Sequence, residues 1–169
     1  TSAYSWVLKR YVLIDVVMLA SLYTLRIVAG AAAAHVVVSV WLLAFSVFVF
    51  MSLALVKRCA ELVTVMQNGA EAVSGRDYRA VDLAVLWPFG VGAGLCAVVV
   101  FALFVNAPET AQRYGAPQLL WFAAIGLLYW LGHLWVKTAR GEMHDDPLVY
   151  AVRDIGSRAT VAFIVAIVL

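Results

Sequence analysis

Residues 38–56 read VSVWLLAFSVFVFMSLALV, an unbroken apolar run that is followed directly by Lys57 and Arg58. A helix needs roughly 20 mostly apolar residues to cross a bilayer. The run carries no charge and does not alternate between apolar and polar residues, which favours a transmembrane helix over a barrel strand. This stretch therefore predicts an all-α fold that is embedded in a membrane.

Further apolar runs on both sides of this stretch extend the prediction. Comparable runs cover about residues 11–34, 83–105 and 117–136, and a fifth begins near Arg158. Hydrophobic residues make up 65% of the chain, whereas soluble domains are about 45–50% apolar. We predict a polytopic transmembrane helical bundle with about five spans present. The chain starts without Met and ends within an apolar run, so we expect both ends to be truncated.

Basic residues gather on one side of these spans. The loops on that side hold 10 of the 12 Lys and Arg residues, whereas Arg113 lies in a loop on the opposite side and Arg26 within a span. By the positive-inside rule, the charged loops face the cytoplasm. Most acidic residues lie on the same side, which suggests a polar site that opens to the cytoplasm. The net charge of +2 gives no indication of nucleic-acid binding.

Two charged residues lie inside the first predicted span. Asp15 and Arg26 are 11 residues apart, which at about 100° per residue places them within roughly 20° of one helix face. Such a face must turn toward protein or water rather than lipid. One interpretation is the wall of a cavity for an anionic head group. The other is an interhelical ion pair with partners outside this chain.

Lys57, Arg58 and Glu61 follow the second predicted span. An Arg fork and a Lys point charge are common ligands of phosphate, which is one interpretation of the pair. The alternative is a topology signal at a helix C-terminus, where basic residues suit the helix dipole. Arg79 stands in the following loop, just before the next span, and a loop of that length often covers a site.

The most polar short run is RGEMHDDPLVY, residues 140–150. Its residues Glu142, His144, Asp145 and Asp146 could ligate a divalent cation such as Mg²⁺. However, adjacent carboxylates point apart, and Pro147 is favoured in the first turn of a helix. Asp146 is then better interpreted as a helix N-cap, with His144 and Asp145 as candidates for the rim of a cavity. We therefore predict no metal site within this chain.

Several of these segments together resemble a known family. The runs YSWVLKRYVLIDVVMLASLYTLRIVAGAAA, SVWLLAFSVFVFMSLALVKRCAEL and GRDYRAVDL resemble the UbiA-type membrane prenyltransferase superfamily. Within it, they are most similar to the decaprenyl-phosphate phosphoribosyltransferase-like branch, and RGEMHDDPLVYAVRD resembles a run in its bacterial members. The resemblance implies that residues 1–169 are the C-terminal half of a bundle of about nine helices around a cavity. It also implies a bacterial inner (cytoplasmic) membrane.

The resemblance assigns roles to individual residues. Those implied to bind the substrate's phosphates are Lys9, Arg10, Lys57 and Arg58, and those implied to line the cavity are Tyr4, Asp15, Arg26, Glu61 and Arg79. Typical members carry a second Asp-rich motif where this chain has Lys57 and Arg58. That departure favours a substrate whose phosphates meet Lys and Arg directly.

The implied function is a transferase that acts on a polyprenyl phosphate or diphosphate, by phosphoribosyl or prenyl transfer, with Mg²⁺ bridging the phosphates. The first Asp-rich motif of the family, which carries the main Mg²⁺ ligands, is not in this chain, so we expect the fragment alone to be inactive. The expected partners are the polyprenyl lipid substrate, membrane lipids and the missing N-terminal half. The alternative is a non-catalytic membrane subunit that packs in a larger membrane complex.

Overall fold

The computed structural model describes residues 13–69, 78–143 and 146–168. The longer helices are α2 (Ile14–Ala33), α3 (Val40–Gln67), α4 (Leu83–Val105) and α6 (Leu120–Ala139). The shorter elements are α5 (Pro108–Arg113), α7 (Pro147–Arg153), α8 (Ile155–Val168), and the 3₁₀ turns η2 (Ala80–Asp82) and η3 (Pro117–Leu119). No strand occurs in these ranges, so the all-α prediction is confirmed for them.

Four helices are long and apolar enough to cross a membrane: α2, α3, α4 with η2, and α6 with η3. They coincide with four of the predicted runs, and the predicted limits of α4 match its observed limits. The fifth run forms α8, which has 14 residues and is therefore about 21 Å long. That is shorter than the roughly 30 Å hydrocarbon core of a bilayer. The described part thus has four candidate spans and one shorter apolar helix.

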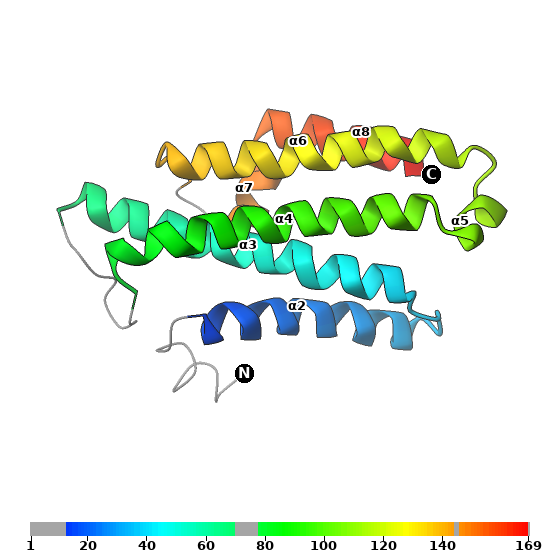
Figure 1. The fold of residues 1–169 in the computed structure, drawn as a ribbon, viewed down its shortest axis with the longest axis horizontal. Helices are drawn as coiled ribbons and strands as arrows, with labels where there is room; N and C mark the ends of the chain where they lie inside the picture. The colour runs from blue at the N-terminus through cyan, green and yellow to red at the C-terminus, as the bar shows by residue number, and fades with distance from the viewer. Residues whose placement is uncertain (1–12, 70–77, 144–145, 169) are drawn as a thin grey trace.

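The four long helices lie side by side, and each runs opposite to the one before it (Figure 1). Helix α3 packs against α2 and α4, and α6 packs against α4 and α8. As a result, the end of α3, the start of α4 and the end of α6 lie on the same side of the bundle. This is the side to which the sequence assigns most of the charged loops, and we call it the charged side.

Close packing between α3, α4 and α6 depends on two glycines. A Cβ atom at Gly90 would lie 2.3 Å from the ring of Trp135, and one at Gly94 would lie 3.0 Å from Ser52 Oγ. The hydroxyl of Ser52 donates to the carbonyl of Gly90 at 2.8 Å and accepts from Trp135 Nε1 at 3.1 Å. The glycine-rich start of the third predicted span therefore serves close helix packing, as small residues do in membranes.

Helix α6 ends in a way that turns the chain back toward α7. Gly141 has a φ of 69°, a left-handed conformation that glycine adopts without strain. Its N–H donates to the carbonyl of Thr138 at 3.0 Å, and the N–H of Glu142 donates to that of Lys137 at 3.1 Å. This pair of hydrogen bonds is a Schellman motif. It places the polar run after α6 beside the charged side of the bundle.

Candidate functional site

A buried ion pair joins α2 to α3 toward the charged side. Arg58 Nε lies 2.6 Å from Asp15 Oδ2, and the two side chains are 3% and 0% exposed. The guanidinium of Arg58 also pairs with the carboxylate of Glu61, one turn further along α3. The hydroxyl of Tyr78 donates to Asp15 Oδ1 and accepts the N–H of Leu13 at 2.9 Å. The carboxylate of Asp15 therefore has partners from two distant segments.

Local structure prepares Asp15 and Tyr78 for this network. Asp15 lies in the first turn of α2, where the helix dipole stabilises a negative charge. Tyr78 precedes η2 and is buried. Burial, together with the hydrogen bond to Asp15, raises the pKa of the Tyr78 hydroxyl well above its ordinary value. Tyr78 therefore remains protonated at neutral pH and can act as a permanent donor to the carboxylate.

Asp15 and Arg26 do not line the wall of one cavity in the described structure, although their spacing along α2 would place them on one helix face. Asp15 is buried against α3, whereas Arg26 is exposed and its guanidinium carbon lies 5.4 Å from the centre of the Tyr23 ring. Of the two interpretations, the interhelical ion pair is the one observed for Asp15. Its partner, Arg58, lies within this chain rather than outside it.

Lys57 does not mark the end of its helix. Helix α3 continues to Gln67 and has its C-cap at Asn68. The interpretation of Lys57 as a charge at a helix C-terminus is therefore wrong. With 28 residues, α3 is about 42 Å long, so it exceeds the roughly 30 Å hydrocarbon core. Lys57 lies ten residues before the last residue of this helix.

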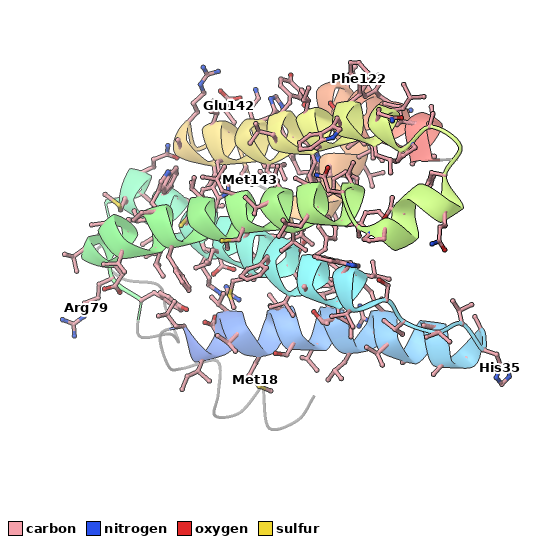
Figure 2. The ribbon with its side chains drawn as sticks, turned by 45° about the vertical axis from the view of Figure 1, so that its right-hand side comes forward. Met18, His35, Arg79, Phe122, Glu142 and Met143 are labelled. Carbon is pink, nitrogen blue, oxygen red and sulfur yellow. The ribbon has the colours of Figure 1, made fainter. Side chains whose placement is uncertain are left out.

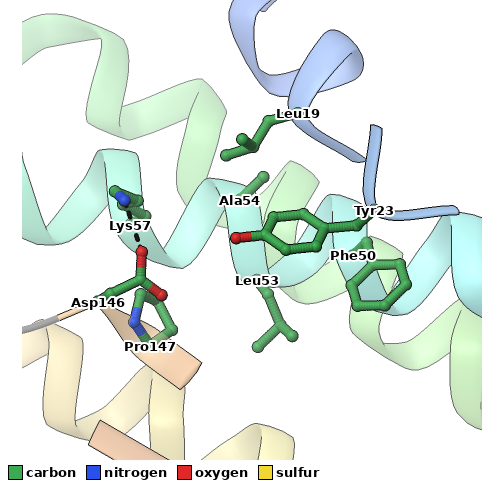
Figure 3. A pocket seen from close by; sticks show the side chains of 8 residues that line it. All are labelled: Leu19, Tyr23, Phe50, Leu53, Ala54, Lys57, Asp146 and Pro147. Carbon is green, nitrogen blue, oxygen red and sulfur yellow. Dashed lines mark hydrogen bonds and ion pairs between the residues drawn. The ribbon is translucent and has the colours of Figure 1, made fainter. Parts of the chain in front are cut away.

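Lys57 lines a small cavity between α2, α3 and the start of α7 (Figure 3). Its Nζ lies 2.5 Å from Asp146 Oδ2, and the two side chains are 36% and 31% exposed. The cavity has a volume of about 20 Å³, which is enough for one water molecule. Figure 3 shows the Tyr23 hydroxyl directed toward the side on which Lys57 and Asp146 lie. The remaining lining residues are Leu19, Phe50, Leu53, Ala54 and Pro147.

Asp146 has the backbone position predicted for it. It directly precedes α7, and its carbonyl accepts the N–H of Tyr150 at 2.8 Å, the first hydrogen bond of that helix. Its side chain, however, reaches Lys57 on α3.

Glu142, from the same polar run, pairs with Lys137, and this hydrogen bond lowers the pKa of Glu142. The other two predicted members of the run, His144 and Asp145, lie outside the described residues.

A second polar cluster joins α6, α7 and α8. Asp154 directly precedes α8, and its Oδ2 accepts the N–H of Ser157 at 2.7 Å and lies 3.2 Å from His133 Nε2. The Tyr150 hydroxyl donates to Asp154 Oδ1 at 3.3 Å. Burial raises the pKa of Asp154. Several interactions lower it, the largest being the hydrogen bond from the backbone N–H of Ser157, and the net result is a lowered pKa. Sequence reasoning missed this cluster, although an Asp before an apolar run is an N-cap signal.

Of the remaining predicted residues, the structure describes Arg79 but not those near the start of the chain. Tyr4, Lys9 and Arg10 lie outside the described residues. The side chain of Arg79 is exposed and points away from the bundle (Figure 2). Its backbone N–H donates to Asp82 Oδ2 at 2.8 Å, so Arg79 begins the turn that leads into α4.

The carboxylates near Lys57 are occupied by cations of the protein itself. Asp15 pairs with Arg58, and Asp146 pairs with Lys57. Within residues 13–69, 78–143 and 146–168, no three His, Cys, Asp or Glu side chains are placed to hold a metal ion. These residues therefore do not supply a set of three such ligands by themselves.

Two tyrosines lie near the charges, and the sequence did not predict which charged residues they would lie beside. Tyr78 is separated from Asp15 by 63 positions, so no helical periodicity connects them. In the sequence, Tyr78 stands out only as an aromatic residue among charged neighbours just before a span. Tyr23 shares a helix with Asp15, but its place beside Lys57 depends on the packing of α2 on α3.

Two curated proteins are similar to this chain. An uncharacterized protein, y4nM, of Sinorhizobium fredii is 38% identical over 176 residues, which cover 98% of this chain and 33% of that protein. The nodulation protein NoeC of Azorhizobium caulinodans is 40% identical over 145 residues, which cover 86% of this chain and 47% of that protein. The chain thus spans a third to about half the length of these relatives. No family model and no solved structure matches it.

Proposed function

We propose that this chain is the C-terminal half of a UbiA-type membrane transferase that acts on a polyprenyl phosphate or diphosphate, by phosphoribosyl or prenyl transfer. The observation that carries the proposal is the position of Lys57, a partly exposed cation beside a cavity in a bundle of apolar helices. A lipid phosphate needs a cation for its head and hydrocarbon for its tail. The end of an apolar bundle that bears Lys57 offers both.

The proposal includes a place in the cell and a larger fold. The excess of Lys and Arg on one side supports an orientation with the charged loops in the cytoplasm, within a bacterial inner membrane. The four candidate spans would form part of a bundle of about nine helices. The rest of the full-length protein would supply the other helices and complete the substrate cavity.

The two adjacent cations on α3 have different roles in this proposal. Lys57 contacts the phosphate, since its side chain is 36% exposed. Arg58 is 3% exposed and ion-paired with Asp15 and Glu61, so it positions α3 against α2. Lys9 and Arg10 remain proposed phosphate ligands from the sequence. These charges would bind the phosphate and stabilise the negative charge that develops on a departing diphosphate.

Mg²⁺ is the metal that the family resemblance implies. The carboxylate-rich motif that would hold it belongs to the other half of the protein, and the described residues contain no group of three His, Cys, Asp or Glu ligands. We therefore assign no step of the reaction to the metal on the basis of this chain. The chemistry derived from its own residues is limited to phosphate binding and helix positioning.

The test is transfer activity of the full-length protein in membranes, with phosphoribosyl pyrophosphate as donor and a polyprenyl phosphate as acceptor. A hydrogen bond to a charged group contributes about 1.5–3 kcal/mol. Lys57→Ala should therefore lower activity by about 10- to 100-fold. Lys137→Ala is the matched control, because Lys137 is also an ion-paired lysine toward the charged side but does not line the cavity. Equal activity of the Lys57→Ala variant and the wild type would rule out the phosphate role.

A second candidate function is a non-catalytic membrane subunit. It is favoured by the pairing of Arg58 and Lys57 with carboxylates of the chain itself, which is also the pattern of purely structural ion pairs. Absence of transfer in the full-length protein, together with stoichiometric co-purification with other membrane proteins, would support this function. The name of the Azorhizobium relative refers to nodulation and favours neither function.

A further inference from the structure

The two ion pairs on α3 differ in how easily an anion from outside the chain could replace their carboxylate. The pair between Arg58 and Asp15 is buried, so separating it would leave a charge without solvent. The pair between Lys57 and Asp146 is about one third exposed on each side. Exposed ion pairs contribute about 0–1 kcal/mol. Asp146 is therefore a partner that a second anion can displace at small cost.

The carboxylate of Asp146 occupies the position that a phosphate bound to Lys57 would take. Its carboxylate oxygen lies 2.5 Å from Lys57 Nζ, at the wall of the cavity toward which the Tyr23 hydroxyl is directed (Figure 3). A carboxylate and a phosphate offer an ammonium group the same kind of anionic oxygen acceptor. Tyr23 adds a hydroxyl donor on the same side of the cavity, which phosphate oxygens can also use.

Asp146 also connects this cavity to a helix. Its carbonyl accepts the first hydrogen bond of α7 from Tyr150, and Pro147, the first residue of α7, lines the cavity. The contact of α7 with α3 is small, and the pair between Lys57 and Asp146, the residue before α7, adds a charged link to α3. If the carboxylate leaves Lys57, α7 loses its charged link to α3.

We infer that Asp146 is an internal competitor for the anionic ligand of Lys57. A phosphate group that binds Lys57 and the Tyr23 hydroxyl displaces the Asp146 carboxylate, opens the small cavity and releases α7 from α3. In the absence of ligand, the carboxylate closes the cavity and neutralises Lys57. This inference rests on the proposed function for the role of Lys57, and adds Tyr23 as a ligand and Asp146 with α7 as a gate.

The ligand chemistry is a phosphate monoester or diphosphate, and two probes distinguish its source. Farnesyl phosphate represents a lipid head group, and inorganic pyrophosphate represents a soluble phosphate. Their equilibrium binding to the full-length protein in nanodiscs is measured for the wild type, Asp146→Asn, Lys57→Gln and Lys57→Gln/Asp146→Asn. Glu142→Gln is the matched control, since it removes the same charge from another lysine pair, at the end of α6.

The recognised probe is the one that the wild type binds. Asp146→Asn should bind it about two- to five-fold more tightly than the wild type does, which corresponds to the free energy of an exposed ion pair. Lys57→Gln should weaken binding and abolish this gain in the double variant, whereas Glu142→Gln should bind like the wild type. Tighter binding of farnesyl phosphate alone identifies a lipid head group, and tighter binding of both probes identifies the phosphate itself. Unchanged binding in Lys57→Gln overturns the phosphate role of the proposed function. Weaker binding in Lys57→Gln with no gain in Asp146→Asn overturns the competitor role of Asp146 but not the phosphate role of Lys57.

Hydrogen exchange of α7 provides a second measurement that needs no variant. Addition of the recognised probe to the wild type should speed exchange of the amides of residues 150–153, because α7 loses its link to α3. Simple electrostatic repulsion by Asp146, without displacement, would leave this exchange unchanged. Unchanged or slower exchange with bound probe would therefore overturn the gate.

Discussion

Asp15 on α2 and Arg58 on α3 form an ion pair with 2.6 Å between Oδ2 and Nε, and neither side chain is more than 3% exposed. A buried pair of this kind adds little net stability relative to a well-packed apolar pair, because both charges lose their water. Removing only one member is different, since the other charge then remains buried without its partner. We therefore expect the pair to fix how α2 packs on α3 more than it strengthens the contact.

The first prediction concerns this pair. Asp15→Ala should lower the free energy of unfolding by about 3–5 kcal/mol, because Arg58 would keep a buried charge. Asp15→Leu/Arg58→Met should cost less than the sum of the single changes, since it removes both charges. Reversible unfolding in mixed detergent micelles measures both effects. Arg26→Ala is the control, because Arg26 is an exposed cation on the same helix whose contact with Tyr23 contributes only about 0.5–1 kcal/mol. Equal stability of Asp15→Ala and Arg26→Ala would contradict the assignment.

The second prediction concerns the glycines of α4. A Cβ atom at Gly90 would meet the Trp135 ring at 2.3 Å and Leu55 Cβ at 2.9 Å, whereas one at Gly92 would meet nothing within 4 Å. Gly90→Ala should therefore destabilise the bundle by about 1–3 kcal/mol through overpacking. Gly92→Ala should be neutral or slightly stabilising, since alanine favours a helix. Thermal unfolding of the two variants in detergent checks this, and similar melting temperatures would contradict the close packing at Gly90.

The fold was predictable from the sequence as far as it depends on local composition. Continuous apolar runs determine where spans occur, so the limits of α4 followed from the sequence. The end of α3 did not, because the helix continues past Lys57 through a less apolar segment to Gln67. Hydropathy detects the hydrocarbon part of a helix and misses the part that extends beyond it.

The candidate site was predictable in its charges but not in its pairing. Lys57 and Arg58 could be recognised as unusual cations beside an apolar run. Which of them is buried depends on the packing of α2 on α3, since adjacent helix residues point about 100° apart. The partners Asp146 and Asp15 come from segments that meet only in the folded bundle. One-dimensional spacing contains no information about such contacts.

The third prediction concerns alkaline pH. The pKa of Tyr78 is raised by burial and by its hydrogen bond to Asp15, so the folded state prefers the neutral phenol. The resulting stabilisation is complete below the ordinary tyrosine pKa of about 10 and is lost as the pH rises above it. Unfolding of the wild type should therefore become easier above about pH 10, and Tyr78→Phe should weaken this dependence. A Tyr78→Phe profile parallel to that of the wild type would refute the prediction.

The fourth prediction concerns acid pH and the start of α8. Asp154 caps this helix through its hydrogen bond from the N–H of Ser157 at 2.7 Å, and its pKa is lowered. The folded state thus prefers the carboxylate, and the stabilisation is present above the ordinary Asp pKa of about 4 and is lost as the pH falls below it. Asp154→Ala should cost about 1 kcal/mol at pH 7, the usual value of a lost N-cap.

Asp154→Asn separates the cap from the charge, because asparagine caps a helix about as well as aspartate but does not titrate. At pH 7 it should be more stable than Asp154→Ala, and between about pH 5 and about pH 2 its stability should change less than that of the wild type. Thermal unfolding across this range, with amide hydrogen exchange of the first turn of α8, measures both effects. If Asp154→Ala matches the wild type at pH 7, Asp154 is not the cap of α8. If Asp154→Asn titrates like the wild type, another group causes the acid sensitivity.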